Sequence, residues 1–216
     1  MSTDELFGGE PVITFHKETD RRAFLRWTGL VGVGAALVST GALTGMATAS
    51  ADAPAPSTNG DAGILNYALT LEYLEYNFYA MGLSKGLLSG RDLELVTPIR
   101  SHEQAHVKAV MAAVTQLKGT PVSQPKLKFP AKTFSSADNF LATAVMFEEL
   151  GVTAYQGQVP LIQSVAVLQS AATIAGVESR HAAILEQLTN GNPFPSPVEK
   201  SASMSSVLAN AKPYLA

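Results

Sequence analysis

The sequence predicts an all-α protein, an antiparallel four-helix bundle with one long crossover between its second and third helices. Apolar residues recur at intervals of three and four in four long segments, the spacing of one helix face. A proline-rich stretch separates the second segment from the third, and no segment alternates as a strand would. The four predicted helices cover residues 61–83, 91–117, 135–158 and 165–188.

The first two predicted helices are joined by a short turn. Asp61 is the expected N-cap of the first helix, and residues 84–90 form a glycine-bounded connection typical of antiparallel neighbours. Pro98 interrupts the second segment. Either the helix kinks there, or Thr97 caps a new helix with Pro98 at its first position. Gly119 is expected to end this helix.

The second and third helices are separated by residues 120–133, which contain three prolines and several lysines. This stretch is not expected to be helical, and an extended chain of about 3.3 Å per residue can run the length of a bundle. Ser135 or Ser136 then caps the third helix, which Val159-Pro160 terminates. The fourth helix ends at Asn190-Gly191.

The first 49 residues are expected to be a twin-arginine signal peptide. Arg21-Arg22 is followed by Phe and Leu and then by an apolar run over residues 27–49. Ala47-Thr48-Ala49 is a small-x-small cleavage site, with Ala49-Ser50-Ala51 as an alternative. A retained membrane anchor is the competing interpretation. Both interpretations predict export by the twin-arginine machinery, to the periplasm, the cell envelope or the medium.

Composition divides the rest of the chain and excludes several functions. Residues 50–60 are a predicted disordered linker, residues 61–191 the bundle, and residues 192–216 a proline-rich tail with a short helix at 198–211. No cysteine is present, which excludes disulfides and thiolate ligands. The net charge of −3 provides no basic surface for nucleic acid.

Two Glu-x-x-His motifs are the strongest functional signal. Glu103 and His106 lie in the second predicted helix, and Glu178 and His181 lie in the fourth, 75 residues later (178 − 103). Three residues along a helix correspond to a turn of about 300°, so each Glu and His share one face. Each motif can direct a carboxylate and an imidazole toward the same point.

Each motif is preceded by a helix that carries acidic residues in an apolar run. The first helix offers Glu72 or Glu75, and the third offers Glu148 or Glu149. The spacings to the following motif nearly agree, at 103 − 72 = 31 and 178 − 148 = 30 residues. The sequence thus repeats a glutamate followed by Glu-x-x-His, which places four carboxylates and two imidazoles in one bundle. A dinuclear metal site needs this set of ligands.

This pattern resembles the ferritin-like di-metal carboxylate superfamily over residues 61–191. It is most similar to the ferritin-like domain of exported bacterial proteins related to plant desiccation-related proteins. The resemblance implies two bridging glutamates, two terminal histidines and one further glutamate from each of the other helices. It favours Glu72 over Glu75, seven residues before a tyrosine (79 − 72), and Glu148 over Glu149, three before a glycine (151 − 148). The implied metal ligands are Glu72, Glu103, His106, Glu148, Glu178 and His181, with Glu75 and Glu149 as alternates.

Charge balance supports a pair of divalent cations. Apolar residues surround both motifs, and an unpaired buried carboxylate costs several kcal/mol. Four carboxylates carry a formal charge of −4, which two divalent cations neutralise while the imidazoles remain neutral ligands. Tyr79 and Tyr155 are either core residues or residues that hold a ligand carboxylate.

A zinc hydrolase is the alternative at the first motif. His102, Glu103 and His106 spell His-Glu-x-x-His, in which two histidines bind zinc and the glutamate acts as a base. The second motif has Val177 where the first has His102. The zinc hypothesis therefore leaves the repeat unexplained.

The expected function is that of an exported protein with two divalent iron or manganese ions. Carboxylate-rich ligation suits these metals better than copper. The expected chemistry is redox chemistry with oxygen or peroxide, in oxidative stress or metal handling, and the expected partners are a small-molecule oxidant or a metal ion. A non-catalytic structural or desiccation-protection protein is the alternative. Self-association into a homo-oligomer is a further option.

Overall fold

The structure is a computed structural model that describes residues 60–216. The predicted signal peptide, residues 1–49, and all but the last residue of the predicted linker, residues 50–60, lie outside the described residues. The exception is Gly60, which is the first residue of a helix instead of part of a linker.

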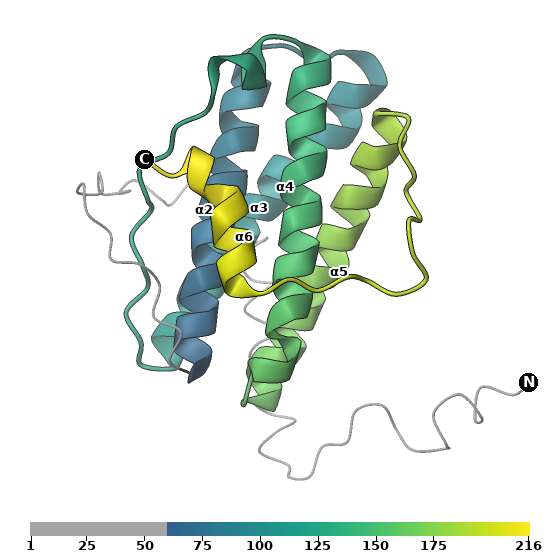
Figure 1. Cartoon of the computed structure of the whole chain (residues 1–216). Helices are drawn as coiled ribbons and strands as arrows, with labels where there is room; N and C mark the ends of the chain where they lie inside the picture. The colour runs from purple at the N-terminus through teal and green to yellow at the C-terminus, as the bar shows by residue number, and fades with distance from the viewer. Residues whose placement is uncertain (1–59) are drawn as a thin grey trace, which may run out of the picture.

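Four long helices pack side by side, as predicted (Figure 1). They are α2 (Gly60–Ser84), α3 (Gly90–Gln116), α4 (Ala137–Gln158) and α5 (Val165–Leu188). Over residues 60–216 the chain forms helices, turns and one isolated β-bridge, with no strand. The prediction of an all-α bundle is therefore confirmed.

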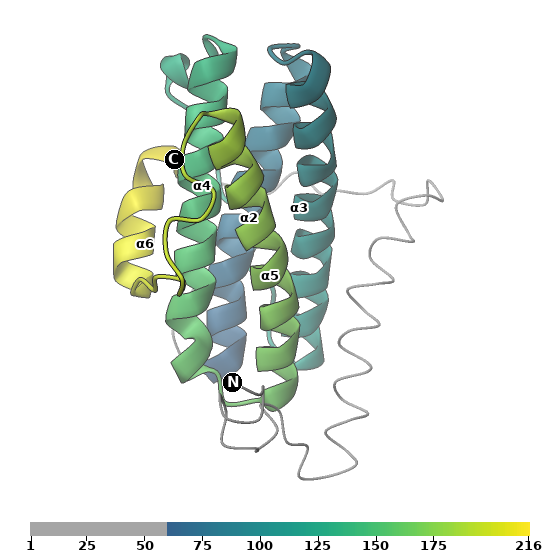
Figure 2. The same cartoon turned by 90° about the vertical axis from the view of Figure 1, so that its right-hand side faces the viewer.

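The helices alternate in direction, and the long connection runs beside them (Figures 1 and 2). A short turn joins α2 to α3, and the 3-10 turn η4 (Val159–Leu161) begins the link from α4 to α5. Between α3 and α4 the chain passes along the outside of the bundle, at the left of Figure 1. The end of this crossover is a second 3-10 turn, η3 (Ala131–Phe134), within a stretch that was predicted to be non-helical.

One helix start differs from the prediction, and an alternative left open at Pro98 is resolved. Asp61 does not cap α2 but lies in its first turn, where its carboxylate accepts hydrogen bonds of 2.8 Å from the backbone N–H groups of Gln163 and Ser164. It thereby ties the start of α2 to the start of α5. Pro98 lies inside a continuous α3 whose N-cap is Ser89, so the alternative with a new helix starting at Pro98 is wrong.

Other helix ends follow from local chemistry. The Ser136 side chain accepts a hydrogen bond from Asn139 N at 3.2 Å at the start of α4, as expected for one of the two candidate serines. Asn190 has a positive φ of 59°, and Gly191 N donates to Glu186 O at 2.7 Å. This closes α5 at the predicted Asn-Gly pair.

The C-terminal residues pack against the bundle. A short helix, α6 (Met204–Ala211), lies against α4 and buries Val207 and Ala211 (Figure 1). It begins later than the predicted helix at 198–211. After it, a bridge pairs Leu215 with Leu127 of the crossover. Within residues 60–216 no helix combines the length and the apolarity needed to cross a membrane.

Two apolar clusters divide the core. The first centres on the Phe78, Phe140 and Phe147 rings, which α6 covers. The second, at the other end of α3 and the start of α5, contains Val114 and Val167. Both Glu-x-x-His motifs lie between residues of the two clusters, so the core around the motifs is shielded from solvent by apolar side chains.

Candidate metal centre

The six residues singled out from the sequence converge in the middle of the bundle. Helices α2 and α4 contribute one carboxylate each, and α3 and α5 contribute a carboxylate and an imidazole each. None of the six side chains belongs to a residue more than 5% exposed. They are Glu72, Glu103, His106, Glu148, Glu178 and His181.

The six residues form two overlapping groups that could each hold a metal ion. The first group consists of Glu72, Glu103, His106 and Glu178, and the second of Glu103, Glu148, Glu178 and His181. In each group, one potential ligand atom per residue lies within 4.8 Å of all the others. Glu103 and Glu178 belong to both groups, so the two groups share two carboxylates.

Both imidazoles present the same nitrogen to the carboxylates. His106 Nδ1 lies 2.9 Å from Glu178 Oε1, 3.3 Å from Glu103 Oε2 and 3.4 Å from Glu72 Oε2. His181 Nδ1 lies 3.1 Å from Glu103 Oε1 and 3.2 Å from Glu148 Oε2. The two motifs, 75 residues apart in sequence (178 − 103), thus make equivalent contacts across the bundle.

Each of the two carboxylates that belong to a single group accepts a hydrogen bond from a tyrosine. Tyr79 donates a hydrogen bond of 2.6 Å to Glu148 Oε1, and Tyr155 donates one of 2.5 Å to Glu72 Oε1. Of the two roles considered for these tyrosines, the geometry favours holding a carboxylate. Each tyrosine occupies one oxygen and leaves the other, Oε2, facing an imidazole.

The two alternate glutamates are in different surroundings. Glu75 is buried but belongs to neither group. Its Oε1 lies 3.0 Å from the place where a Cβ on Gly151 would stand, so the glycine makes room for this carboxyl. Burial, reinforced by the charge of Glu178, raises the pKa of Glu75 well above its usual range. Glu149 is only half-buried and lines a surface hollow.

Burial and neighbouring charges set the protonation of the centre. Burial raises the pKa of Glu72 to about 7, and burial together with Glu103 raises the pKa of Glu178 well above normal. Burial alone would also raise the pKa of Glu103, but His106 and His181 outweigh it and hold that pKa below its usual range. The carboxylates in turn outweigh burial at both imidazoles and raise the pKa of His181 to about 10.

Several carboxylate oxygens of the centre have no hydrogen-bond donor. They are Glu72 Oε2, Glu103 Oε1 and both oxygens of Glu178. Three of these oxygens, Glu72 Oε2, Glu103 Oε1 and Glu178 Oε1, lie near an imidazole nitrogen, but the contacts are not aligned as hydrogen bonds. A buried polar atom without a partner costs about 1–3 kcal/mol, more when it is charged. Three of these oxygens belong to Glu103 and Glu178, which both groups share, and the fourth belongs to Glu72 of the first group. Oxygen-rich ligand sets with imidazole suit iron and manganese.

His102 has a position that the sequence did not reveal. Its Nδ1 lies 2.8 Å from His181 Nε2, and the two rings are nearly parallel, with centroids 5.1 Å apart. It belongs to neither group of potential ligands and contacts the ring edge of His181 that faces away from the carboxylates. The geometry therefore makes His102 a partner that orients His181. The only sequence signal was that the second motif has Val177, and not a histidine, at the position equivalent to His102.

Comparison with known proteins agrees with the fold. A family model described as a ferritin-like domain matches residues 60–191, which include all of α2 to α5. No curated protein matches the chain. Because the matched region spans most of the chain and contains both motifs, this protein belongs to the ferritin-like domain family.

Proposed function

We propose that this protein binds two iron or manganese ions and uses them in redox chemistry with oxygen or peroxide, in oxidative-stress defence or metal handling. The observation that carries the proposal is the pair of overlapping ligand groups that share Glu103 and Glu178. A mononuclear site would need only one such group. Four buried carboxylates with two imidazoles match the charge of two divalent ions.

The residues divide into three roles. Glu103 and Glu178 would bridge the ions, and His106 and His181 would each bind one ion through Nδ1. Glu72 and Glu148 would complete the two ligand sets with the oxygen that the tyrosines leave free. Two adjacent iron or manganese ions supply the electrons with which oxygen or peroxide is reduced.

The surrounding side chains position the ligands and exclude water. The tyrosine hydrogen bonds fix the rotation of two carboxylates, so less order is lost when an ion binds. His102, at 2.8 Å, fixes the ring of His181 from behind. The apolar clusters on either side lower the local dielectric, which strengthens every charge interaction in the centre.

Export by the twin-arginine route is part of the proposal. It is supported by Arg21-Arg22 and the apolar run at residues 27–49. This route carries folded proteins, so the metal centre can be assembled before export. The protein would then act in the periplasm, at the envelope or outside the cell, with a small-molecule oxidant as its partner.

A non-catalytic structural protein is the second candidate, and one observation favours it. The carboxylates raise the pKa of both imidazoles, so His106 and His181 are cationic at neutral pH and neutralise part of the cluster without metal. A bundle that stabilises its own buried charges does not need ions in order to fold. Retention of the full ligand set favours the metal-binding alternative.

Elemental analysis of protein purified from its own exported fraction tests the proposal. We expect close to two iron or manganese ions per chain, and none in a Glu103→Ala, Glu178→Ala double variant that remains helical by circular dichroism. One zinc per chain would favour the hydrolase, and no metal in a folded protein would favour the structural role. His102→Ala separates the ligand assignments further. It should retain both ions, whereas loss of all metal would make His102 a ligand.

A further inference from the structure

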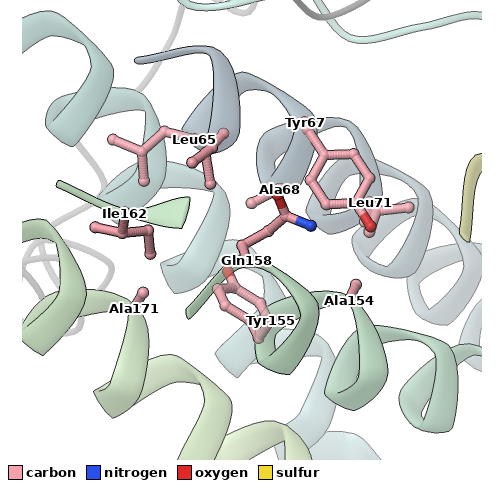
Figure 3. A pocket seen from close by; sticks show the side chains of 10 residues that line it. Leu65, Tyr67, Ala68, Leu71, Ala154, Tyr155, Gln158, Ile162 and Ala171 are labelled. Carbon is pink, nitrogen blue, oxygen red and sulfur yellow. The ribbon is translucent and has the colours of Figure 1, made fainter. Parts of the chain in front are cut away.

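The two halves of the candidate metal centre match closely. His106 and His181 both turn Nδ1 toward the carboxylates, and they are 5% and 4% exposed. The tyrosine hydrogen bonds to Glu72 and Glu148 are 2.5 and 2.6 Å long. The ring of Tyr155 borders a small apolar cavity between α2, α4 and α5 (Figure 3), yet its hydroxyl makes the same kind of contact as that of the other tyrosine. From these ligands alone, the two metal positions would differ little in affinity.

One difference lies directly behind the histidine ligands. In the first motif the residue before the glutamate is His102, and in the second motif it is Val177. His102 Nδ1 lies 2.8 Å from His181 Nε2. Within residues 60–216, no side chain forms a hydrogen bond with Nε2 of His106, whose polar contacts are made by Nδ1. One of the two ligand imidazoles is therefore supported from behind by a second imidazole, and the other is not.

The contact between the two imidazoles has a defined direction. The ring planes are inclined by only 9°, and the two nitrogens, 2.8 Å apart, are much closer than the ring centroids at 5.1 Å. The rings thus approach each other through these nitrogens. A neutral imidazole that binds an ion through Nδ1 carries its proton on Nε2, so His181 donates and His102 Nδ1 accepts.

A hydrogen bond of this kind strengthens a metal ligand in two ways. It holds the ring in the orientation that directs Nδ1 at the ion, so less order is lost on binding. It also draws on the Nε2 proton, which makes Nδ1 more basic and a better electron donor to the ion. Loss of such a partner lowers metal affinity by about 10–100-fold. In this protein the effect acts on His181 alone, because Val177 offers no acceptor at the equivalent place.

We propose that His102 makes the two metal positions unequal, so that the group containing His181 fills first and binds its ion more tightly than the group containing His106. The inference rests on the function proposed above, since it uses the same six ligands. His102 is a positioning residue that acts through His181. An ion at the His181 position also orients Glu103 and Glu178, which both groups share, so filling this position prepares the other one.

A second difference between the two halves has to be separated from the effect of His102. Three residues after Glu72 the chain has Glu75, and three residues after Glu148 it has Gly151. Glu75 is buried but belongs to neither group. Burial and then the charge of Glu178 raise the pKa of Glu75 most, and Glu178 belongs to both groups. Glu75→Gln is therefore the control, and it should leave the order of filling unchanged.

Crystals of the full-length protein that contain fewer manganese ions than chains test the order of filling. The anomalous scattering of manganese gives the occupancy of each position separately. In the wild type we expect the position at His181 to be occupied about 10–100 times more than the position at His106. His102→Val, which copies the second motif, should bring the two occupancies close together. The double variant His102→Val, Val177→His moves the supporting imidazole to the other motif, and it should reverse the order.

Isothermal titration with manganese shows whether the hydrogen bond is the cause. His102→Val should weaken the tighter binding step by about 10–100-fold. His102→Asn should retain most of the affinity, because its side-chain oxygen is separated from the backbone by the same number of bonds as Nδ1 and can accept in its place. Circular dichroism should show the same helix content in all variants. An equal loss of affinity in the Asn and Val variants would overturn the role of the hydrogen bond.

The outcomes separate this inference from the proposed function. Equal occupancies in the wild type, or a preference that survives in His102→Val, would overturn the inference and leave the dinuclear centre intact. A wild-type protein that takes up no manganese or iron at either position would refute the proposed function, and with it any order of filling.

Discussion

Metal binding should become steeply tighter as the pH rises, because the centre holds protons when it is free of metal. His106 and His181 both have pKa values raised far above the ordinary range by the carboxylates around them. Each presents Nδ1 to the place where an ion would lie, and a protonated nitrogen cannot bind a metal. At neutral pH each imidazole must therefore lose a proton when an ion binds.

The size of the effect follows from the pKa of His181. With a pKa of about 10 the ring is deprotonated in only about one molecule in a thousand at pH 7, a cost of about 4 kcal/mol at about 1.36 kcal/mol per pH unit. The affinity of the ion at this ring should rise about tenfold for each pH unit between 6 and 8. With both imidazoles contributing, binding of two ions should release at least two protons per chain.

Isothermal titration with manganese at several pH values, in buffers of different ionisation enthalpy, measures both quantities. The dependence of the observed heat on the buffer gives the number of protons released. The Glu103→Ala, Glu178→Ala double variant serves as the control for weak surface binding. An affinity that is constant from pH 6 to pH 8, or release of fewer than one proton per chain, would refute the reasoning.

The stability of the metal-free protein should depend on pH, because buried groups of the centre bind protons more tightly in the folded than in the unfolded state. A raised pKa of His181 adds stability that is complete below its unfolded value of 6.5 and is lost as the pH rises toward about 10. A raised pKa of Glu72 acts in the same direction. The unfolded chain loses this proton near pH 4.5 and the folded protein keeps it up to about pH 7, so the added stability is lost as the pH rises through that interval. Denaturation midpoints of the metal-free protein should therefore fall from pH 5 to pH 10. A rise over this interval would contradict both assignments.

Two further predictions concern single positions. Glu148→Ala should remove at least one of the two ions, because Glu148 is buried in the centre. Glu149→Ala, at the half-buried neighbouring position, should retain both ions in elemental analysis. Equal metal loss in the two variants would reject the choice of Glu148 over Glu149. Gly82→Ala should destabilise the fold by about 1–3 kcal/mol, because its Cβ would stand 2.2 Å from a phenylalanine ring carbon of α4. Gly176→Ala is the control, since a Cβ there meets nothing within 4 Å. In urea denaturation it should be neutral or stabilising by about 1 kcal/mol. Equal midpoints in the two variants would show that the core around Gly82 can move to accommodate a methyl group.

The periodicity of apolar residues was sufficient to predict the four helices and the crossover, because helix formation depends on local spacing and on breakers such as proline and glycine. The error at Asp61 arises because a distant contact competes with a local one. Asp61 has the side chain of an N-cap, yet it bonds to the backbone at the start of another helix. At Pro98 the sequence left two alternatives open, and the structure shows that the helix continues through the proline.

For the candidate site, too, the sequence determined some features and the tertiary structure determined others. The sequence by itself determined which residues are the candidate metal ligands, because the repeat of Glu and Glu-x-x-His fixes the position of each along its own helix. Only the tertiary structure decided that Glu72 and Glu148, and not their acidic neighbours, join the two groups. It also revealed the His102–His181 contact and, among the described residues, the buried Tyr67 and Gln158 polar groups that have no hydrogen-bond partner. These features depend on how helices are rotated against one another, and helical spacing within a single segment carries no information about that rotation.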